Sequence, residues 1–258
     1  MKFTEGYWEK SERANASHAM QAFIVEEIPN GMQIVAPFHI ITDRSGALDV
    51  GTITIEFTAI RKDVISVRSW HFEGYQRKEP RFELNKDMQD VDVEVTDEKA
   101  IMTAGRMQVC VDRKDFKIEY KADGKVLTTC GFRNIGYMQY DRSNSTKFPE
   151  SNYMYSDYTP YMNTELSLAP GECVYGMGER FTSFVKNGQV VDCWNEDGGT
   201  ASQISYKNIP FYMTNKNYGI LVDHTDNVSF EVASEKVEYV GFSVKGEELR
   251  FDLIYGAP

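Results

Sequence analysis

The sequence predicts an all-β protein built as a large antiparallel β-sandwich, and three observations carry this prediction. Apolar and polar residues alternate along short segments such as residues 53–57 (ITIEF) and 91–95 (VDVEV), which is the pattern of a strand with one buried face. Turn-forming residues separate these segments at short intervals. No stretch of three helical turns carries a sustained apolar stripe at i, i+3, i+4 and i+7. Many short strands without helices favour two antiparallel sheets packed face to face.

The strands of the first part of the chain follow in order from this alternation. Apolar side chains recur at every second position in five segments, at residues 23–27, 32–37, 53–57, 64–68 and 91–95. The alternation is interrupted once, in the segment 64–68. Asn30 and Gly31 lie between the first two segments, and both residue types tolerate the positive φ of a tight hairpin turn. We therefore expect a β-hairpin here.

The second part of the chain continues the same pattern. Strands are expected at 107–112, 116–121, 126–129, 219–222, 228–232, 236–240 and 249–255. Asp123 and Gly124 supply a second hairpin signal, before the strand at 126–129. Ile209 and Pro210 also lie in an apparent strand. Because proline cannot donate to a sheet ladder, that strand must lie at an edge or contain a special peptide bond.

Composition and charge narrow the class of protein. The 258 residues have near-average apolar and charged content, which excludes disordered and low-complexity classes and allows a real core without disulfides or metals. Lys and Arg number 28 against 39 Asp and Glu, giving a net charge of −11. A nucleic-acid partner requires a basic surface, and an anionic membrane surface would repel this chain. We predict neither partner.

The N-terminal residues carry one early cation but no apolar region typical of a signal peptide. No stretch approaches the ~18 apolar residues of a membrane span. The sequence therefore predicts a cytoplasmic protein.

Cysteine and histidine spacing gives no metal or cofactor motif. The cysteines, which form no C-x-x-C pair and are expected to be free and mostly buried thiols, are Cys110, Cys130, Cys173 and Cys193. The histidines are equally scattered, at His18, His39, His71 and His224. A mutarotase-like enzyme on a sandwich would need a His/Glu pair, and this scatter gives no support for one. Walker, G-x-S-x-G, H-E-x-x-H and G-x-G-x-x-G motifs are absent. We predict no metal and no cofactor.

One segment departs from the strand pattern. Residues 137–161 are rich in Tyr, Ser, Asn and Asp and poor in aliphatic side chains, and a loop of this length is functional or disordered in most domains. Tyrosine rings pack on sugar C–H groups while their hydroxyls bind sugar hydroxyls. The plainer alternative is an aromatic-rich excursion that packs on a neighbouring domain or along a sheet edge.

Four motifs follow one another in the last third of the chain. They are VYGMGERF at 174–181, WNEDGGT at 194–200, YKNIPFY at 206–212 and NYGILV at 217–222. This succession resembles the N-terminal β-sandwich of glycoside hydrolase family 31, whose members carry Y-G-x-G-E-R, W-N-x-D, Y-x-x-I-P-F-Y and Y-G-x-x-V in that order. Residues 187–189 and 197–200 look most similar to the bacterial α-xylosidase branch.

The resemblance implies a galactose-mutarotase-like supersandwich and a role in carbohydrate metabolism. The family hydrolyses O-glycosyl bonds of α-glycosides with retention, using two carboxylic acids that belong to a TIM barrel following the sandwich. We expect residues 1–258 to be the N-terminal domain of an α-xylosidase or α-glucosidase, with the catalytic barrel absent from this chain. The implied partners are that barrel, an α-linked oligosaccharide held together with it, and possible further copies of the chain. No catalytic residue is assigned, and the chain alone is expected to be inactive.

The motifs also supply the candidate site residues. Gly176 and Gly178 allow a sharp bend before Glu179, and Glu179 beside Arg180 is more typical of a structural charge clamp than of an acid or base. Trp194 is placed to close the top of the sandwich.

The 194–200 loop carries the candidate substrate contacts. Asn195 and Asp197 precede two glycines, so their short polar side chains should lie at a loop tip, where the simplest role for Asp197 is turn capping. The resemblance implies instead that Asp197 reaches into the barrel's pocket and contacts sugar hydroxyls, with Asn195 and Trp194 beside it. Glu196 departs from the family, in which a basic residue is often found.

Two further functions stay open at this point. A free-standing carbohydrate-binding module would bind oligosaccharides without a barrel. A domain-docking module would carry a large exposed apolar patch and no sugar affinity.

Overall fold

The computed structural model describes residues 3–5, 9–74, 80–141, 158–198 and 202–256 of the chain. Within these residues the chain forms 21 strands and no helix, so it offers no helix long and apolar enough to cross a membrane. All the strand pairings are antiparallel. The all-β sandwich is confirmed.

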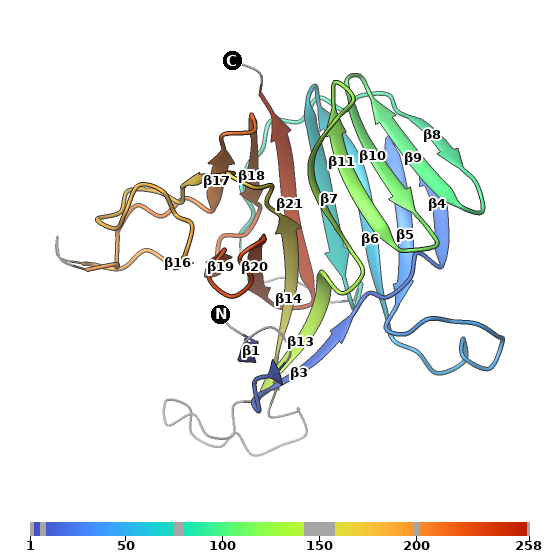
Figure 1. Ribbon diagram of the computed structural model, residues 1–258, viewed down its shortest axis with the longest axis horizontal. Coiled ribbons are helices and arrows are strands. Elements are labelled where there is room, and N and C mark those ends of the chain that lie inside the picture. Colours follow the sequence, from blue (N-terminus) through green and yellow to red (C-terminus); the bar gives the residue numbers. More distant parts are fainter. Residues whose placement is uncertain (1–2, 6–8, 75–79, 142–157, 199–201, 257–258) are drawn as a thin grey trace.

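One eight-stranded sheet forms a continuous layer of the sandwich (Figure 1). Its order is β15 (Val174–Gly176), β17 (Phe211–Thr214), β18 (Tyr218–Val222), β21 (Glu248–Tyr255), β7 (Val64–Trp70), β6 (Thr52–Arg61), β5 (Gly31–Pro37) and β4 (Ile24–Ile28). Along β6 the buried Ile53, Ile55 and Phe57 alternate with half-buried polar residues, because successive side chains of a strand point to opposite faces.

Two shorter sheets cover the core face of the eight-stranded sheet. The five-stranded sheet has the order β12 (Lys125–Gly131), β11 (Lys117–Ala122), β10 (Met107–Asp112), β9 (Lys99–Ala104) and β8 (Asp92–Val95). The six-stranded sheet has the order β16 (Gln189–Cys193), β19 (Val228–Val232), β20 (Tyr239–Lys245), β14 (Tyr158–Ser167), β13 (Ile135–Asp141) and β3 (Ala14–His18). A two-stranded ribbon, β1 (Thr4–Glu5) and β2 (Glu9–Lys10), completes the set.

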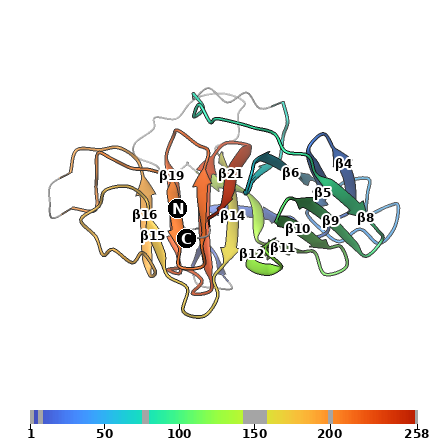
Figure 2. The same ribbon diagram turned by 90° about the horizontal axis from the view of Figure 1, so that it is seen from above.

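One apolar core runs through all three large sheets. Ring contacts join the layers: Tyr120 of β11 lies 6.2 Å from Phe57, and Phe242 of β20 lies 5.3 Å from Phe251 of β21. Tyr120 also contacts Phe251 at 6.5 Å, so the two halves of the core are continuous. The view from above shows the five-stranded sheet along one half of the molecule (Figure 2).

Both predicted hairpins are confirmed. Strands β4 and β5 join through Pro29 and Asn30, whose φ is +56°. Strands β11 and β12 join through Asp123 and Gly124, both at positive φ. Of the expected strands, 236–240 is wrong, because residues up to 238 form a turn and the strand begins at Tyr239. Val237, which completed the apparent alternation, is 80% exposed in that turn.

The Tyr-rich segment is also corrected in part. Its two ends are not loop but the paired strands β13 and β14, in which Tyr137 lies opposite Met162 and Tyr140 opposite Thr159. The buried face of β14 carries Thr159 and Thr164 beside Met162 and Leu166, so the apolar alternation was masked. The stretch 142–157, with the sugar-binding role considered for it, lies outside the described residues.

Candidate functional site

The described residues of the first and second motifs lie at the end of the molecule farthest from β8, and those outside β15 belong to a segment that extends away from the sheets (Figures 1 and 2). Strand β15 ends in a turn in which Gly176, Met177 and Gly178 have φ of +115°, +67° and +88°. This confirms the sharp bend before Glu179. Gly178 also permits a close approach, because a Cβ there would lie 2.0 Å from the carbonyl oxygen of Lys207.

Arg180 is the centre of the local hydrogen bonding. Its Nε donates to the carbonyl of Met177 at 3.0 Å, Nη1 to that of Gln203 at 3.1 Å and Nη2 to that of Asp192 at 2.9 Å. Nη2 also donates to the side-chain oxygen of Asn208. A guanidinium has donors fixed in one plane, so these bonds join the turn after β15, the end of β16 and the 203–208 segment.

Asn208 extends this network to the candidate loop. Its amide nitrogen donates to the carbonyl oxygens of Trp194 and Ser205, each at 2.7 Å, and to Oδ1 of Asn195 at 3.0 Å. Its backbone N–H donates to the same Asn195 oxygen at 2.9 Å. The N–H of Glu196 donates to the carbonyl of Ser205 at 3.0 Å. Three successive loop residues, Trp194, Asn195 and Glu196, are therefore hydrogen-bonded to the 203–208 segment.

The three predicted contact residues differ in their surroundings. Asn195 has its side-chain oxygen engaged with Asn208 of the 203–208 segment. Trp194 is 46% exposed and is not part of the apolar core, so the prediction that it closes the top of the sandwich is wrong. It follows Cys193, the last residue of β16 that pairs with β19. Asp197 is exposed, and its carboxylate forms no hydrogen bond with any residue that the structure describes. The predicted turn capping by Asp197 involves Gly199, which is not among the described residues.

Gly198 differs from the expectation in another way. Its φ is not in the left-handed region, but a Cβ there would lie 2.4 Å from the carbonyl oxygen of Ile204. Glycine is therefore required at this position for close packing of the loop against the 203–208 segment.

A groove of about 830 Å³ lies beside the loop. It is lined by one guanidinium, by aromatic and apolar side chains, and by amides, hydroxyls and acids. These residues are Arg180, Phe181, Thr182, Ser183, Gln189, Val190, Val191, Asp192, Trp194, Glu196, Gln203, Ile204 and Asn227. Exposed rings next to amides can pack on sugar C–H groups and bind hydroxyls.

The same end of the molecule exposes many large apolar side chains. We call them the apolar end surface: Phe181, Phe184, Val185, Val190, Trp194, Ile204, Tyr206, Ile209 and Met213. Phe184 is 79% exposed. Such a concentration is typical of an interaction surface.

Glu179 and Cys193 have contacts of a structural kind. Glu179 pairs with Lys207 at 3.2 Å, and both side chains are largely exposed; the clamp predicted here is formed by Arg180 on carbonyl oxygens instead. Burial raises the pKa of the Cys193 thiol to about 11, although Arg180 opposes this shift, so the thiol is neutral. In the described part of the chain no group of three His, Cys, Asp or Glu side chains could hold a metal ion.

A His/Glu pair exists that the histidine spacing did not indicate. His71 Nδ1 lies 2.7 Å from Glu247 Oε2, and the Tyr137 hydroxyl donates to Glu247 Oε1 at 2.9 Å. The His71 ring is stacked on Tyr137 at 3.9 Å and on Phe38 at 5.8 Å. The pair forms because the β20–β21 turn meets the end of β7, 176 residues away, and no sequence motif signals such a contact.

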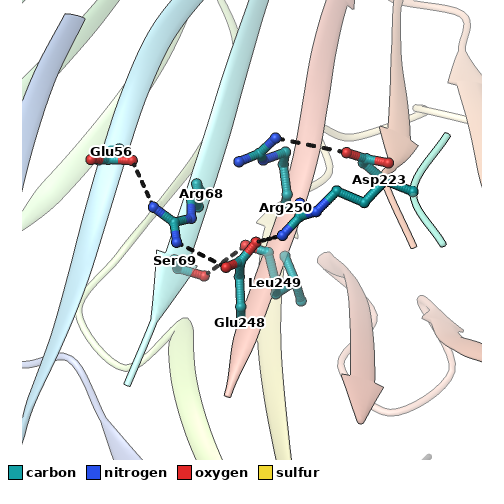
Figure 3. A network of polar contacts seen from close by, with 8 residues as sticks. Glu56, Arg68, Ser69, Asp223, Glu248, Leu249 and Arg250 are labelled. Carbon is teal, nitrogen blue, oxygen red and sulfur yellow. Dashed lines mark hydrogen bonds and ion pairs between the residues drawn. The ribbon is translucent and has the colours of Figure 1, made fainter. Parts of the chain in front are cut away.

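A second polar cluster lies on the outer face of the eight-stranded sheet (Figure 3). Glu248 accepts a hydrogen bond from Arg68 at 2.9 Å and one from Arg81 at 2.8 Å. Arg68 also contacts Glu56 at 3.4 Å, and Arg250 lies 3.9 Å from Asp223. Arg81 belongs to the segment between β7 and β8, so this cluster attaches that segment to the sheet.

Comparison with known proteins places this geometry in context. Residues 54–231 match the family described as glycosyl hydrolase 31 N-terminal galactose mutarotase-like domain. The chain is 37% identical over 257 residues to α-xylosidase XylQ of Lactiplantibacillus pentosus and 36% identical over 270 residues to an α-xylosidase of Emericella nidulans. These matches cover 99% of the chain but 32% and 34% of the relatives. The chain thus spans about a third of their length.

Solved structures share the fold. The cycloalternan-forming enzyme of Listeria monocytogenes in complex with a pentasaccharide substrate aligns with a TM-score of 0.72 over 94% of this chain and 21% of that one, at 15% identity. A family 31 α-xylosidase from a soil metagenome, complexed with xylose, aligns with a TM-score of 0.59 over 90% of this chain and 32% of that one, at 13% identity.

Proposed function

Because the chain belongs to the family of glycosyl hydrolase 31 N-terminal, galactose mutarotase-like domains, we propose that it is the N-terminal domain of a retaining α-glycosidase of the α-xylosidase or α-glucosidase type. Two of its relatives are α-xylosidases of about three times its length. The proposed role of this domain is to supply one wall of the substrate pocket. The two catalytic carboxylates, ~5–5.5 Å apart in retaining enzymes, belong to a barrel that follows this domain.

The exposed carboxylate of Asp197 carries this proposal. The loop is held through Trp194, Asn195 and Glu196, while no described residue uses the Asp197 oxygens. A carboxylate on a fixed backbone can accept hydrogen bonds from sugar hydroxyls without competition from its own protein. Asp197 is thus the proposed substrate contact, and Trp194, three residues before it, lines the groove.

The apolar end surface supports the second half of the proposal. Exposed rings and aliphatic side chains beside a substrate loop are suited to packing on another domain, so that burying this surface brings the loop to the pocket. We propose the barrel as the domain that covers it.

Substitution of Asp197 tests the proposed contact. The test uses the proposed whole enzyme, that is, this domain together with the barrel; we call it the longer polypeptide. There, Asp197→Ala should lower kcat/KM for an α-xyloside by a factor that corresponds to about 1.5–3 kcal/mol, the scale of a lost charged hydrogen bond. Asp97→Ala, which removes an exposed carboxylate in the turn before β9, is the control and should leave the kinetics unchanged. Unaltered kinetics of Asp197→Ala would reduce this residue to a capping role.

A carbohydrate-binding module without catalysis is the second candidate, favoured by the rings and amides that line the groove. It predicts that the 258-residue chain binds xylo- or gluco-oligosaccharides in calorimetric titrations, and that Trp194→Ala abolishes this binding. A cytoplasmic location and assembly into a homo-oligomer remain predictions from the sequence.

A further inference from the structure

We infer that Arg180 and Asn208 are positioning residues for the substrate loop, acting on the sugar through Asp197 without touching it. This inference rests on the proposed function, since it gives Asp197 the substrate contact. Arg180 is charged and lines the groove, so a direct contact with substrate would be the simpler role for it.

The hydrogen bonds of Arg180 indicate positioning. Each nitrogen of its guanidinium donates to a backbone carbonyl, at 2.9–3.1 Å, and Nη2 also donates to the side-chain oxygen of Asn208. A surface arginine that binds substrate keeps donors directed at the ligand. Here the donors are used to join three backbone segments that are distant in sequence.

Asn208 connects Arg180 to the loop through hydrogen bonds. Its side-chain oxygen accepts from Arg180, which orients the amide so that the nitrogen faces the carbonyl of Trp194 and Oδ1 of Asn195. An amide flipped by half a turn would present its oxygen to both acceptors. Arg180 therefore selects the one orientation of Asn208 in which the loop is bound.

The loop is fixed on both sides of Asp197. Before it, the Glu196 N–H is bonded to the carbonyl of Ser205; after it, Gly198 packs directly on the carbonyl of Ile204. Asp197 itself contributes no hydrogen bond to a described residue. Its position is set by its neighbours, so the carboxylate can be pre-organised and still be available to a ligand.

A double-mutant cycle in the longer polypeptide tests the inference. Arg180→Met keeps an unbranched side chain and removes the donors, and it should lower kcat/KM for an α-xyloside at least about tenfold. In an Asp197→Ala background the same substitution should change kcat/KM less than about twofold. Lys207→Gln, which removes an exposed positive charge one residue before Asn208, is the matched control and should have no effect in either background.

Amide hydrogen exchange of the 258-residue chain supplies a readout independent of catalysis. Arg180→Met should speed exchange of the amides of Glu196 and Asn208, whose partners depend on the network, and leave β6 and β7 unchanged. If Arg180→Met does not fold, Asn208→Ser provides the same cycle. An equal loss of kcat/KM in both backgrounds, or faster exchange throughout the sheets, overturns the inference and leaves Asp197 as a contact. An Asp197→Ala variant with native kinetics overturns instead the proposed substrate contact of Asp197, on which this inference rests.

Discussion

Single residues decide where the candidate loop can lie. Gly178 is one of them, since its φ is +88° and a Cβ would meet the carbonyl oxygen of Lys207 at 2.0 Å. Gly198 has a similar role against Ile204. These two contacts bring both ends of the site against one backbone segment, so the loop conformation depends on the absence of two β-carbons.

Gly178→Ala should lower the free energy of unfolding by about 2–5 kcal/mol, the sum of a left-handed φ penalty and of overpacking against a backbone atom. Gly105→Ala is the matched control, since Gly105 also has positive φ (+58°) and a β-carbon added there would have no described atom within 4 Å. That variant should lose only about 1–2 kcal/mol. Urea unfolding of both variants measures the difference, and equal losses would contradict the close approach at Gly178.

The sequence predicted part of the site at this scale. The bend at Gly176 and Gly178 follows from glycine chemistry and is confirmed, and Asp197 was expected on a loop. The roles of Arg180 and Asn208 were not predicted, because the bonds by which they join separate segments are between residues 12 to 28 positions apart. Hydrogen bonds to backbone carbonyls leave no pattern in a sequence.

At the scale of elements, one carboxylate joins Arg81, in the segment between β7 and β8, to the eight-stranded sheet. Burial alone raises the pKa of Glu248, but hydrogen bonds and charges of Arg68 and Arg81 outweigh burial and hold the pKa below its usual value. A carboxyl whose pKa is lower in the folded than in the unfolded chain stabilises the fold above the unfolded pKa. Glu248 is thus expected to hold Arg81, and with it the segment, at neutral pH.

Glu248→Gln should therefore cost about 1–3 kcal/mol of unfolding free energy at pH 7. The difference from the native chain should persist above the pKa of an unfolded glutamate, about 4.3, and disappear as the pH falls through the lower folded value. Glu26→Gln, on the exposed side of β4, should be neutral at every pH. Unfolding curves between pH 3 and 7 check this, and a difference that grows on acidification would contradict the account.

Elements were predictable where one face of a strand is apolar. Strand β10 has the predicted bounds, and β5 begins only one residue before its prediction. The strands β13 and β14 were missed, because threonines and tyrosines take positions that aliphatic residues would mark. The strand predicted at 236–240 was placed too early, because Val237 fits the apolar alternation although it lies in a turn before β20.

At the scale of the whole molecule, the sandwich was predictable but the arrangement of its sheets was not. Arg68 of β7 lies opposite Arg250 of β21 in the eight-stranded sheet, and alternation carries no information on such distant pairing. The division of the second layer into two sheets depends on the same long-range contacts. The apolar end surface likewise combines residues of several motifs and loops that no single stretch of sequence indicates.

The central claim is that this domain supplies a substrate loop to an active site completed by another domain. The most direct measurement compares hydrolysis of p-nitrophenyl α-xyloside by the purified 258-residue chain and by the longer polypeptide read from the same frame. The account predicts no turnover by the chain alone and turnover by the longer polypeptide. Turnover by the chain alone, at a rate that survives repurification, would contradict it.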